Sequence, residues 1–107
     1  MSPTPDLVCK AIGDATRRSL FERLVREGEK SVTALTAKAG ISQPAVSRHL
    51  RVLKRAGLIR DRPAGRETYY RAEPKGLAPL IGWMERYAVF WDARFDALEN
   101  ILSRMDN

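Results

Sequence analysis

The side chains of this sequence that could do chemistry are mainly basic, and they are concentrated between positions 42 and 71. The segment has two acids, Asp61 and Glu67, and eight basic residues: Arg48, Arg51, Lys54, Arg55, Arg60, Arg62, Arg66 and Arg71. The rest of the chain has eleven of each sign, so the whole net charge of +6 comes from this segment. Because a solvated surface usually mixes both signs, the asymmetry favours binding of a polyanion.

A helix predicted over 42–57 would place many of these residues on one face. Ser42 can cap its first turn, Pro44 is tolerated in that turn, and Gly57 suits its end. Val46, Leu50 and Leu53 form an apolar stripe at helical spacing, which predicts burial of that side. The residues left facing outward are Gln43, Pro44, Ser47, Arg48 and Arg51.

The outward face of this helix predicts contacts with double-stranded DNA. In a major groove, Gln43 can pair bidentately with adenine and Arg48 with guanine. Phosphate contacts are expected from the amides of the first turn, which Ser42 opens. Salt-dependent phosphate contacts are also expected from the trailing residues Arg51, Lys54 and Arg55.

A two-stranded hairpin, the wing, is predicted over 58–72. "LIRDR" and "ETYYR" are β-prone runs on either side of the turn-forming sequence "PAGR". Arg66 at the tip could reach a minor groove, with Arg62 and Arg71 on flanking phosphates. Alternatively, Arg62 pairs with Glu67 across the hairpin and Arg66 is only solvated.

Helices are also predicted ahead of this unit. A short helix from Pro5 to about Gly13 has the apolar residues Leu7, Val8, Ala11 and Ile12. Asp14 can cap a second helix that ends at Gly28, with one apolar face made of Leu20, Phe21, Leu24 and Val25. Ser31 opens a third helix, whose inward residues are Val32, Leu35 and Ala39.

The third helix and the helix at 42–57 form a predicted helix-turn-helix. Gly40 supplies the left-handed position in the turn between them, from which Ile41 returns to the core. His49 lies at the margin of the apolar stripe, where either packing or contact with DNA is open to it. Ser47 and His49 are two positions apart and project in different directions, so they are not a catalytic pair.

The pattern is helical again from 75 to 105, with Pro79 in the first turn or at a kink. A helix of ~30 residues spans ~45 Å, which is more than a small core can cover, so its aromatic residues predict a homodimer. The expected interface residues are Leu7, Val8, Ile12, Trp83, Tyr87, Phe90, Trp91, Phe95 and Leu98. The alternative for the aromatic residues is a pocket for an unknown small-molecule effector.

At 107 residues, the chain is predicted to be a single domain, 1–107, that is mostly α with a small β-hairpin wing: a winged helix-turn-helix with N- and C-terminal dimerisation helices. The single cysteine, Cys9, cannot form an internal disulfide, and no run of ~18 apolar residues is present, so a cytoplasmic protein with no membrane partner is predicted. Cys9 itself is read as a small hydrophobe, with a redox role as the alternative.

No cofactor, metal site or enzymatic activity is predicted. One cysteine and one histidine cannot supply a soft-metal site within a subunit. Asp92, Asp96 and Glu99 share a helix face, but they are read as solvated or as paired with Arg86 or Arg94 of a partner chain. No paired carboxylates, Cys/His arrangement or phosphate-binding glycine loop is present.

The sequence "SVTALTAKAGISQPAVSRHLRVLKRAGLIRDRPAGRETYYR" resembles the helix-turn-helix and wing of the ArsR/SmtB family of bacterial transcriptional repressors. "AIGDATRRSLFERL" is similar to the preceding helix, and the C-terminal segment resembles a metal-free branch of the family. The resemblance implies a homodimeric repressor that binds an inverted-repeat operator, with Gln43, Pro44, Ser47 and Arg48 at the DNA-reading positions. The alternative is a winged-helix protein-interaction module without DNA binding.

Overall fold

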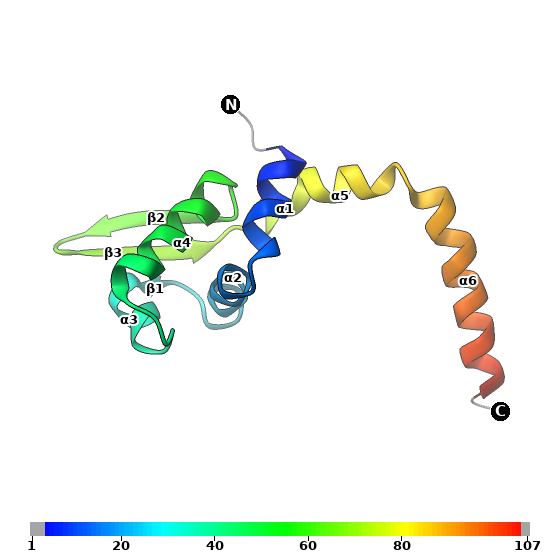
Figure 1. Cartoon of the computed structure of the whole chain (residues 1–107), viewed down its shortest axis with the longest axis horizontal. Helices are drawn as coiled ribbons and strands as arrows, with labels where there is room; N and C mark the ends of the chain where they lie inside the picture. Colours follow the sequence, from blue (N-terminus) through cyan, green and yellow to red (C-terminus); the bar gives the residue numbers. More distant parts are fainter. Residues whose placement is uncertain (1–3, 106–107) are drawn as a thin grey trace.

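The fold consists of a helical body with a β-hairpin on one side and a C-terminal extension. The computed structural model describes residues 4–105, except for the side chains of 91–95. The elements in chain order are α1 (Pro5–Gly13), α2 (Ala15–Glu27), β1 (Lys30–Ser31), α3 (Val32–Ala37), α4 (Gln43–Arg55), β2 (Ile59–Ala64), β3 (Glu67–Ala72), the 3-10 helix η1 (Pro74–Leu77), α5 (Ala78–Glu85) and α6 (Ala88–Met105). Figure 1 shows α5 leading away from the body and α6 lying apart from it.

Side-chain caps set the starts of three helices, as predicted. Asp14 Oδ1 accepts the N–H of Arg17 at 3.0 Å at the start of α2. Ser31 Oγ accepts the N–H of Ala34 at 3.1 Å in α3, and Ser42 caps α4 in the same way. These bonds satisfy amides that have no partner inside the helix and therefore fix where each helix begins.

Loss of the Asp14 cap is expected to destabilise the chain. The Arg17 N–H holds the pKa of Asp14 below its ordinary value, so the stabilisation is present above the unfolded-state pKa and is lost as pH falls through the lower folded-state pKa. Asp14→Ala should lower the free energy of unfolding at pH 7, and hence the urea concentration at the midpoint of unfolding. Asp14→Asn keeps a capping oxygen and should lose much less; an alanine variant as stable as the parent would contradict this role.

The core lies between α1, α2, α4 and the base of the hairpin. Its buried residues are Val8, Ala11, Leu20, Phe21, Leu24, Leu35, Val46, Leu50, Leu53, Ala56, Leu58 and Ile59. The predicted apolar stripe of α4 is confirmed, since Val46, Leu50 and Leu53 are fully buried. The opposite side of α4 is consequently turned to solvent.

Three residues are more exposed than predicted. Val25 is half exposed because it lies at the edge of the apolar face of α2, beyond Leu24. Ile41 lies in the turn before α4 and is also exposed, so it does not return to the core. Cys9 is exposed as well and does not pack as a core hydrophobe.

The sheet is antiparallel with the strand order β1-β3-β2. The predicted hairpin is confirmed, with Ile59 opposite Ala72 and Ala64 opposite Glu67. Gly65 has φ 63° at the first of the two turn positions, where a type II′ turn requires a positive φ. The two-residue strand β1 was not predicted because so short a strand has no periodicity of its own.

The prediction of one helix over 75–105 is wrong, because this region is divided into η1, α5 and α6. Pro79 lies in the first turn of α5. The break falls at Arg86 and Tyr87, whose amides bond three residues back, to Trp83 O at 3.3 Å and Met84 O at 3.0 Å. Bonds of this kind tighten the turn, so α6 leaves in a new direction (Figure 1).

Candidate nucleic-acid interface

The solvent-facing side of α4 carries the candidate DNA-reading residues. Gln43 and Pro44 are exposed in its first turn, Ser47 is half-buried, and Arg48 is exposed one turn further along. Ser42, Arg51, Lys54 and Arg55 are exposed as well. At 100° per residue, Pro44, Arg48, Arg51 and Arg55 fall within an arc of about 60°, opposite the buried stripe. These four residues therefore lie on one surface of the helix, which we call the α4 face.

The basic residues of segment 42–71 divide into two groups. Three form ion pairs: Lys54 Nζ with Asp61 Oδ2 at 2.9 Å, Arg60 Nε with Glu73 Oε2 at 3.0 Å, and Arg62 with Glu29. The others have no carboxylate partner within the part of the chain that the structure describes: Arg48, Arg51, Arg55, Arg66 and Arg71. Excess positive charge without a partner is thus located on the α4 face and along the hairpin.

The predicted alternative of an Arg62–Glu67 pair across the hairpin is wrong. Arg62 donates from both ends of its guanidinium to Glu29, at 2.6 and 3.2 Å, and lies 4.9 Å above the ring of Tyr69. Glu67 instead accepts a hydrogen bond from Thr33 Oγ1 at 3.0 Å. The strand register explains this, because it sets Arg62 opposite Tyr69 and Glu67 opposite Ala64 at the turn.

Hydrogen bonds from the paired bases shift the pKa values of their partners. The Arg62 guanidinium lowers the pKa of Glu29, and the Lys54 ammonium lowers the pKa of Asp61. The Asp61 carboxylate in turn raises the pKa of Lys54. Both carboxylates therefore stay ionised at neutral pH and hold Arg62 and Lys54 in ion pairs.

His49 faces the body of the protein. Its ring is half-buried, and Nδ1 lies 3.4 Å from Arg17 Nη1. Because arginine has no acceptor, Nδ1 must be the acceptor in this contact. Arg17 also donates to Ala11 O and Lys10 O, each at 2.9 Å. Arg17 therefore ties the C-terminal end of α1 to α4, a role with no signal in the sequence because it depends on the packing of distant helices.

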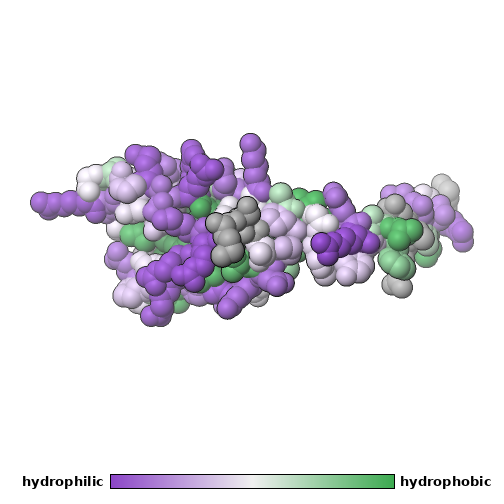
Figure 2. All heavy atoms as spheres, turned by 90° about the horizontal axis from the view of Figure 1, so that it is seen from above, coloured by the Kyte–Doolittle hydropathy of each residue, from purple (hydrophilic) through white to green (hydrophobic). Residues whose placement is uncertain are grey.

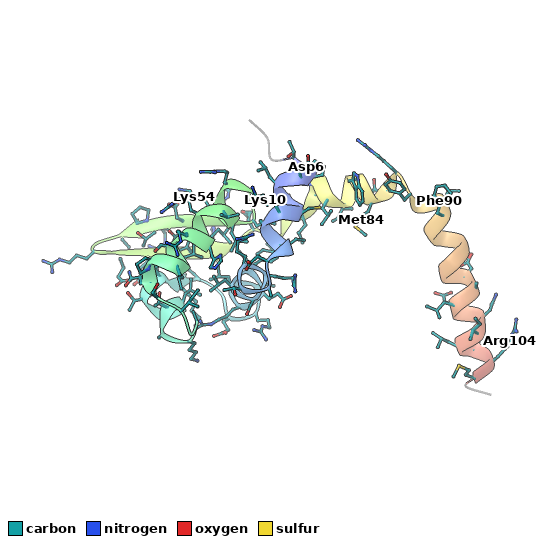
Figure 3. The ribbon with its side chains drawn as sticks, in the orientation of Figure 1. Asp6, Lys10, Lys54, Met84, Phe90 and Arg104 are labelled. Carbon is teal, nitrogen blue, oxygen red and sulfur yellow. The ribbon has the colours of Figure 1, made fainter. Side chains whose placement is uncertain are left out.

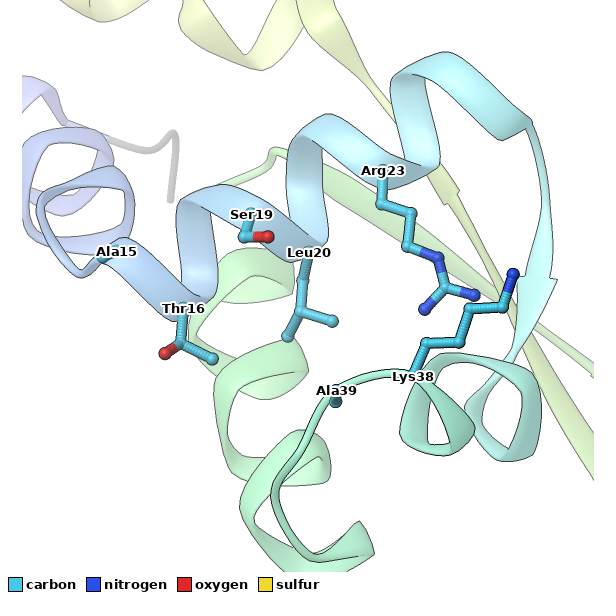
Figure 4. Close-up of a pocket in the computed structure, with 7 residues that line it drawn as sticks. All are labelled: Ala15, Thr16, Ser19, Leu20, Arg23, Lys38 and Ala39. Atoms are coloured by element: carbon cyan, nitrogen blue, oxygen red, sulfur yellow. The ribbon is translucent and has the colours of Figure 1, made fainter.

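A hollow of about 240 Å³ lies between α2 and the turn after α3 (Figure 4). Its lining includes two basic residues, Arg23 and Lys38. The guanidinium of Arg23 already donates to Leu35 O at 3.2 Å and Ala34 O at 3.3 Å, and its Nε pairs with Glu27. Arg23 therefore holds α2 to the end of α3, where it satisfies carbonyls that the short helix leaves without partners.

The candidate dimer residues fall into three groups. Trp83, Tyr87, Phe90 and Leu98 are exposed on α5, α6 and the turn between them, with the Trp83 and Tyr87 ring centroids 5.2 Å apart. Leu7 and Ile12 are half-buried on α1. The prediction for Val8 is wrong, because its side chain is fully buried in the core of its own chain. The side chains of Trp91 and Phe95 lie outside the described residues.

Apolar side chains remain uncovered along the C-terminal extension. Met84 and Phe90 project from α5 and α6 without a neighbouring element beside them (Figure 3). Figure 2 shows hydrophilic residues over most of the body on the side in view, and apolar residues mixed with hydrophilic ones along the extension. An apolar surface of this extent is typical of a protein–protein interface.

Neither a metal site nor a membrane span is found in the described part of the chain. No group of three or more His, Cys, Asp or Glu residues there is arranged to hold a metal ion. Asp96 and Glu99 are both exposed on α6. The side chain of Asp92 lies outside the described residues. None of the described helices combines the length and apolar character that a membrane crossing requires.

Comparison with known proteins identifies relatives of the whole architecture. Residues 12–62 match a helix-turn-helix domain family. The chain is 44% identical over 84 residues, 78% of each chain, to the HTH-type transcriptional regulator Rv2034 of Mycobacterium tuberculosis. An ArsR-like transcriptional regulator from Rhodococcus sp. RHA1 superposes with a TM-score of 0.70 at 31% identity, covering 91% of each chain.

A further solved structure is a homodimer. It is the winged helix-turn-helix DNA-binding domain Mb0332 of Mycobacterium bovis, described as a possible ArsR-family transcriptional regulator. It superposes with a TM-score of 0.62 at 29% identity, over 78% of this chain and 76% of that one.

Proposed function

Because this chain belongs to the ArsR/SmtB family of winged helix-turn-helix transcriptional regulators, we propose that it is a homodimeric repressor that binds an inverted-repeat operator through its α4 face. The observation that carries the proposal is the arrangement of charge on α4. Arg48, Arg51 and Arg55 share a surface and have no carboxylate partner among the described residues, while the opposite stripe is fully buried. Binding of a duplex phosphate backbone is the function that such a surface serves best.

The leading end of α4 is proposed to read base edges. Gln43 can form two hydrogen bonds with adenine, and Arg48 can form two with guanine. Pro44 and Ser47 lie between them, where small side chains allow close approach to the groove floor. Ser42, at the N-cap, is placed with the first-turn amides that point toward a phosphate.

The remaining basic residues are proposed to bind phosphate. Arg51 and Arg55 extend along the α4 face away from its leading end, and Arg66 lies at the exposed tip of the wing. Lys54 and Arg62 are also proposed to bind phosphate, but each must first break the ion pair with its carboxylate partner. Exposed pairs of this kind contribute little to stability, so phosphate can replace the carboxylate.

The exposed residues of the C-terminal extension are proposed to hold two copies together. A two-fold axis would then relate two α4 helices and set them one turn of DNA apart, ~34 to 36 Å. The homodimeric Mb0332 domain supports this assembly. Each dimer would read two half-sites of opposite orientation, which is what an inverted repeat provides.

An electrophoretic mobility shift with DNA from upstream of the chain's own gene tests the function. We expect a discrete shifted species at low salt that weakens steeply as salt is raised, because phosphate contacts release counterions. An unrelated duplex of equal length is the control, and it should bind more weakly. No shift at low salt would contradict the proposal and favour the alternative of a protein-interaction module.

The competition between carboxylate and phosphate yields a prediction for Asp61. Asp61→Asn removes the acceptor of Lys54 and a negative charge beside the α4 face. We expect DNA affinity to rise by a few-fold for all sequences alike, because a phosphate contact no longer has to displace a salt bridge. Titration of a labelled duplex by fluorescence anisotropy measures this, with Glu73→Gln, which frees Arg60, as a comparison; unchanged or lower affinity of Asp61→Asn would contradict it.

A further inference from the structure

Helix α6 lies outside the body of its own chain. The Cα radius of gyration is 17.7 Å, compared with about 13 Å for a compact domain of this length. Figure 1 shows the reason, since α5 carries α6 away from every other element. An isolated helix of 18 residues is only marginally stable in water, so α6 requires a surface to pack against.

One side of α6 is suited to such packing. Phe90, Leu98, Ile101 and Met105 fall within an arc of about 80° at 100° per residue. Each of these side chains is from about half to three quarters exposed. Glu99 and Ser103 lie on the opposite side of the helix. We call the four apolar residues the α6 stripe.

The body carries an apolar groove between α2 and η1. It has a volume of about 340 Å³, with Phe21 and Val25 on one side and Pro74 and Leu77 on the other. Glu22 and Arg26 complete its lining. Val25 belongs to the apolar face predicted for α2, but its side chain is half exposed in this groove. An element packed over this groove would bury Val25, as the apolar pattern of α2 predicts.

We propose that the α6 stripe of one protomer packs into the α2–η1 groove of a second copy of this chain, so that the two copies exchange their C-terminal helices. The inference rests on the homodimer of the proposed function and specifies how it is built. The occupant is a second copy because α5 directs α6 away from the groove of its own chain (Figure 1). In a dimer with two-fold symmetry, each protomer docks its α6 in the groove of the other, so the buried apolar area is doubled.

Charge supports this pairing of surfaces. Helix α2 has four arginines and two glutamates, whereas α6 has three acids and two arginines. The two helices therefore carry net charges of opposite sign, which favours their association. The groove also continues into the proposed dimer surface, because Leu77 is followed directly by α5 and its exposed Ile81 and Met84.

Disulfide trapping between chains of different size tests the exchange. In a Cys9→Ser background, one chain carries Val25→Cys and a second, with a larger tag, carries Ile101→Cys; both are co-expressed and oxidised. We expect a disulfide-linked species containing one chain of each size on a non-reducing gel. Leu98→Cys and Met105→Cys extend the test along the stripe, whereas Ser103→Cys, on the opposite side of α6, should give little product.

Other products would overturn the proposal in distinguishable ways. A disulfide between two copies of the Ile101→Cys chain would show that α6 packs against α6. A disulfide within one chain that carries both cysteines would show that α6 folds back on its own groove. A dimer in sedimentation analysis that is trapped at none of the stripe positions would overturn the exchange and leave the proposed function intact, whereas a monomer would refute the homodimer itself.

A groove variant provides a second measurement that does not depend on oxidation. Val25→Glu places a charge in the proposed contact at a position that is half exposed in the single chain. We expect the dimer dissociation constant to rise at least tenfold while the helical circular dichroism spectrum is retained. An unchanged dissociation constant in the folded variant would overturn the groove as the docking surface.

Discussion

Replacing Arg48 with alanine is expected to weaken binding by about 1–3 kcal/mol for each half-site of the operator and to remove the preference for guanine at one position in each half-site. Arg48 lies in the second turn of α4, exposed and without a carboxylate partner in the described chain. No intramolecular contact therefore has to break before its guanidinium reaches O6 and N7 of a base. Competition binding with single-base variants of the operator measures both effects.

The matched control is Arg55→Ala, at the other end of the same α4 face. Arg55 is also exposed and has no ion-pair partner in the part of the chain that the structure describes, but its place in the last turn of α4 favours phosphate. Its removal should weaken binding to all sequences alike and reduce the slope of log affinity against log salt concentration by about two per dimer, roughly one for each Arg55. If both variants lose the same affinity on every sequence, the division into base-reading and phosphate-binding ends is wrong.

The second large effect is expected at Gly76, where alanine should lower the free energy of unfolding by about 2–3 kcal/mol. Gly76 lies in η1, packed against the turn that follows α4. A Cβ added there would overlap the carbonyl oxygen of Gly57 and lie 2.7 Å from its carbon and 3.1 Å from Leu58 Cα. These are backbone atoms, and Leu58 is held in place by burial and by the bond from Glu73 N to its carbonyl at 2.7 Å.

Gly82→Ala is the control for this substitution. Gly82 lies inside α5, and a Cβ there meets no heavy atom within 4 Å. Alanine at this position should stabilise the helix by up to about 1 kcal/mol, because it restricts the unfolded chain and favours helix. Thermal denaturation should therefore shift the two variants in opposite directions; a Gly76→Ala protein as stable as the parent would show that η1 and the turn can move apart.

Local signals made the α4 face predictable. Ser42 and Asp14 cap helices through bonds that span only three residues, and the spacing of Val46, Leu50 and Leu53 fixes which side of α4 is buried. A helix with one side fixed leaves its opposite side exposed. The outward position of Arg48 therefore follows from the sequence before any tertiary contact is known.

The features that were missed depend on contacts between distant segments. Arg62 pairs with Glu29, 33 residues away, rather than with the nearby Glu67, because the strand register places Glu67 at the turn. Val8 belongs to the core because α1 packs on both α2 and α4. An apolar pattern marks a residue for burial, but it does not say whether its own core or a second chain covers it.

The break between α5 and α6 illustrates the same limit. The apolar residues from Leu80 to Met105 keep helical spacing across Arg86 and Tyr87, so the pattern contains no sign of the interruption. A tight turn of two residues changes the direction of a helix while shifting its periodicity only slightly. The turn at Arg86 and Tyr87 gives α6 its direction within the chain, and in the proposed dimer a second copy of the chain covers its apolar stripe.

Two copies of the chain are proposed to place their α4 helices in successive major grooves of one operator. Guanine N7 methylation protection on the upstream DNA tests it directly, because N7 lies in the major groove. We expect two protected patches of opposite orientation whose centres lie one helical turn apart, about 10–10.5 base pairs. A single protected patch, or protection without two-fold symmetry, would contradict it.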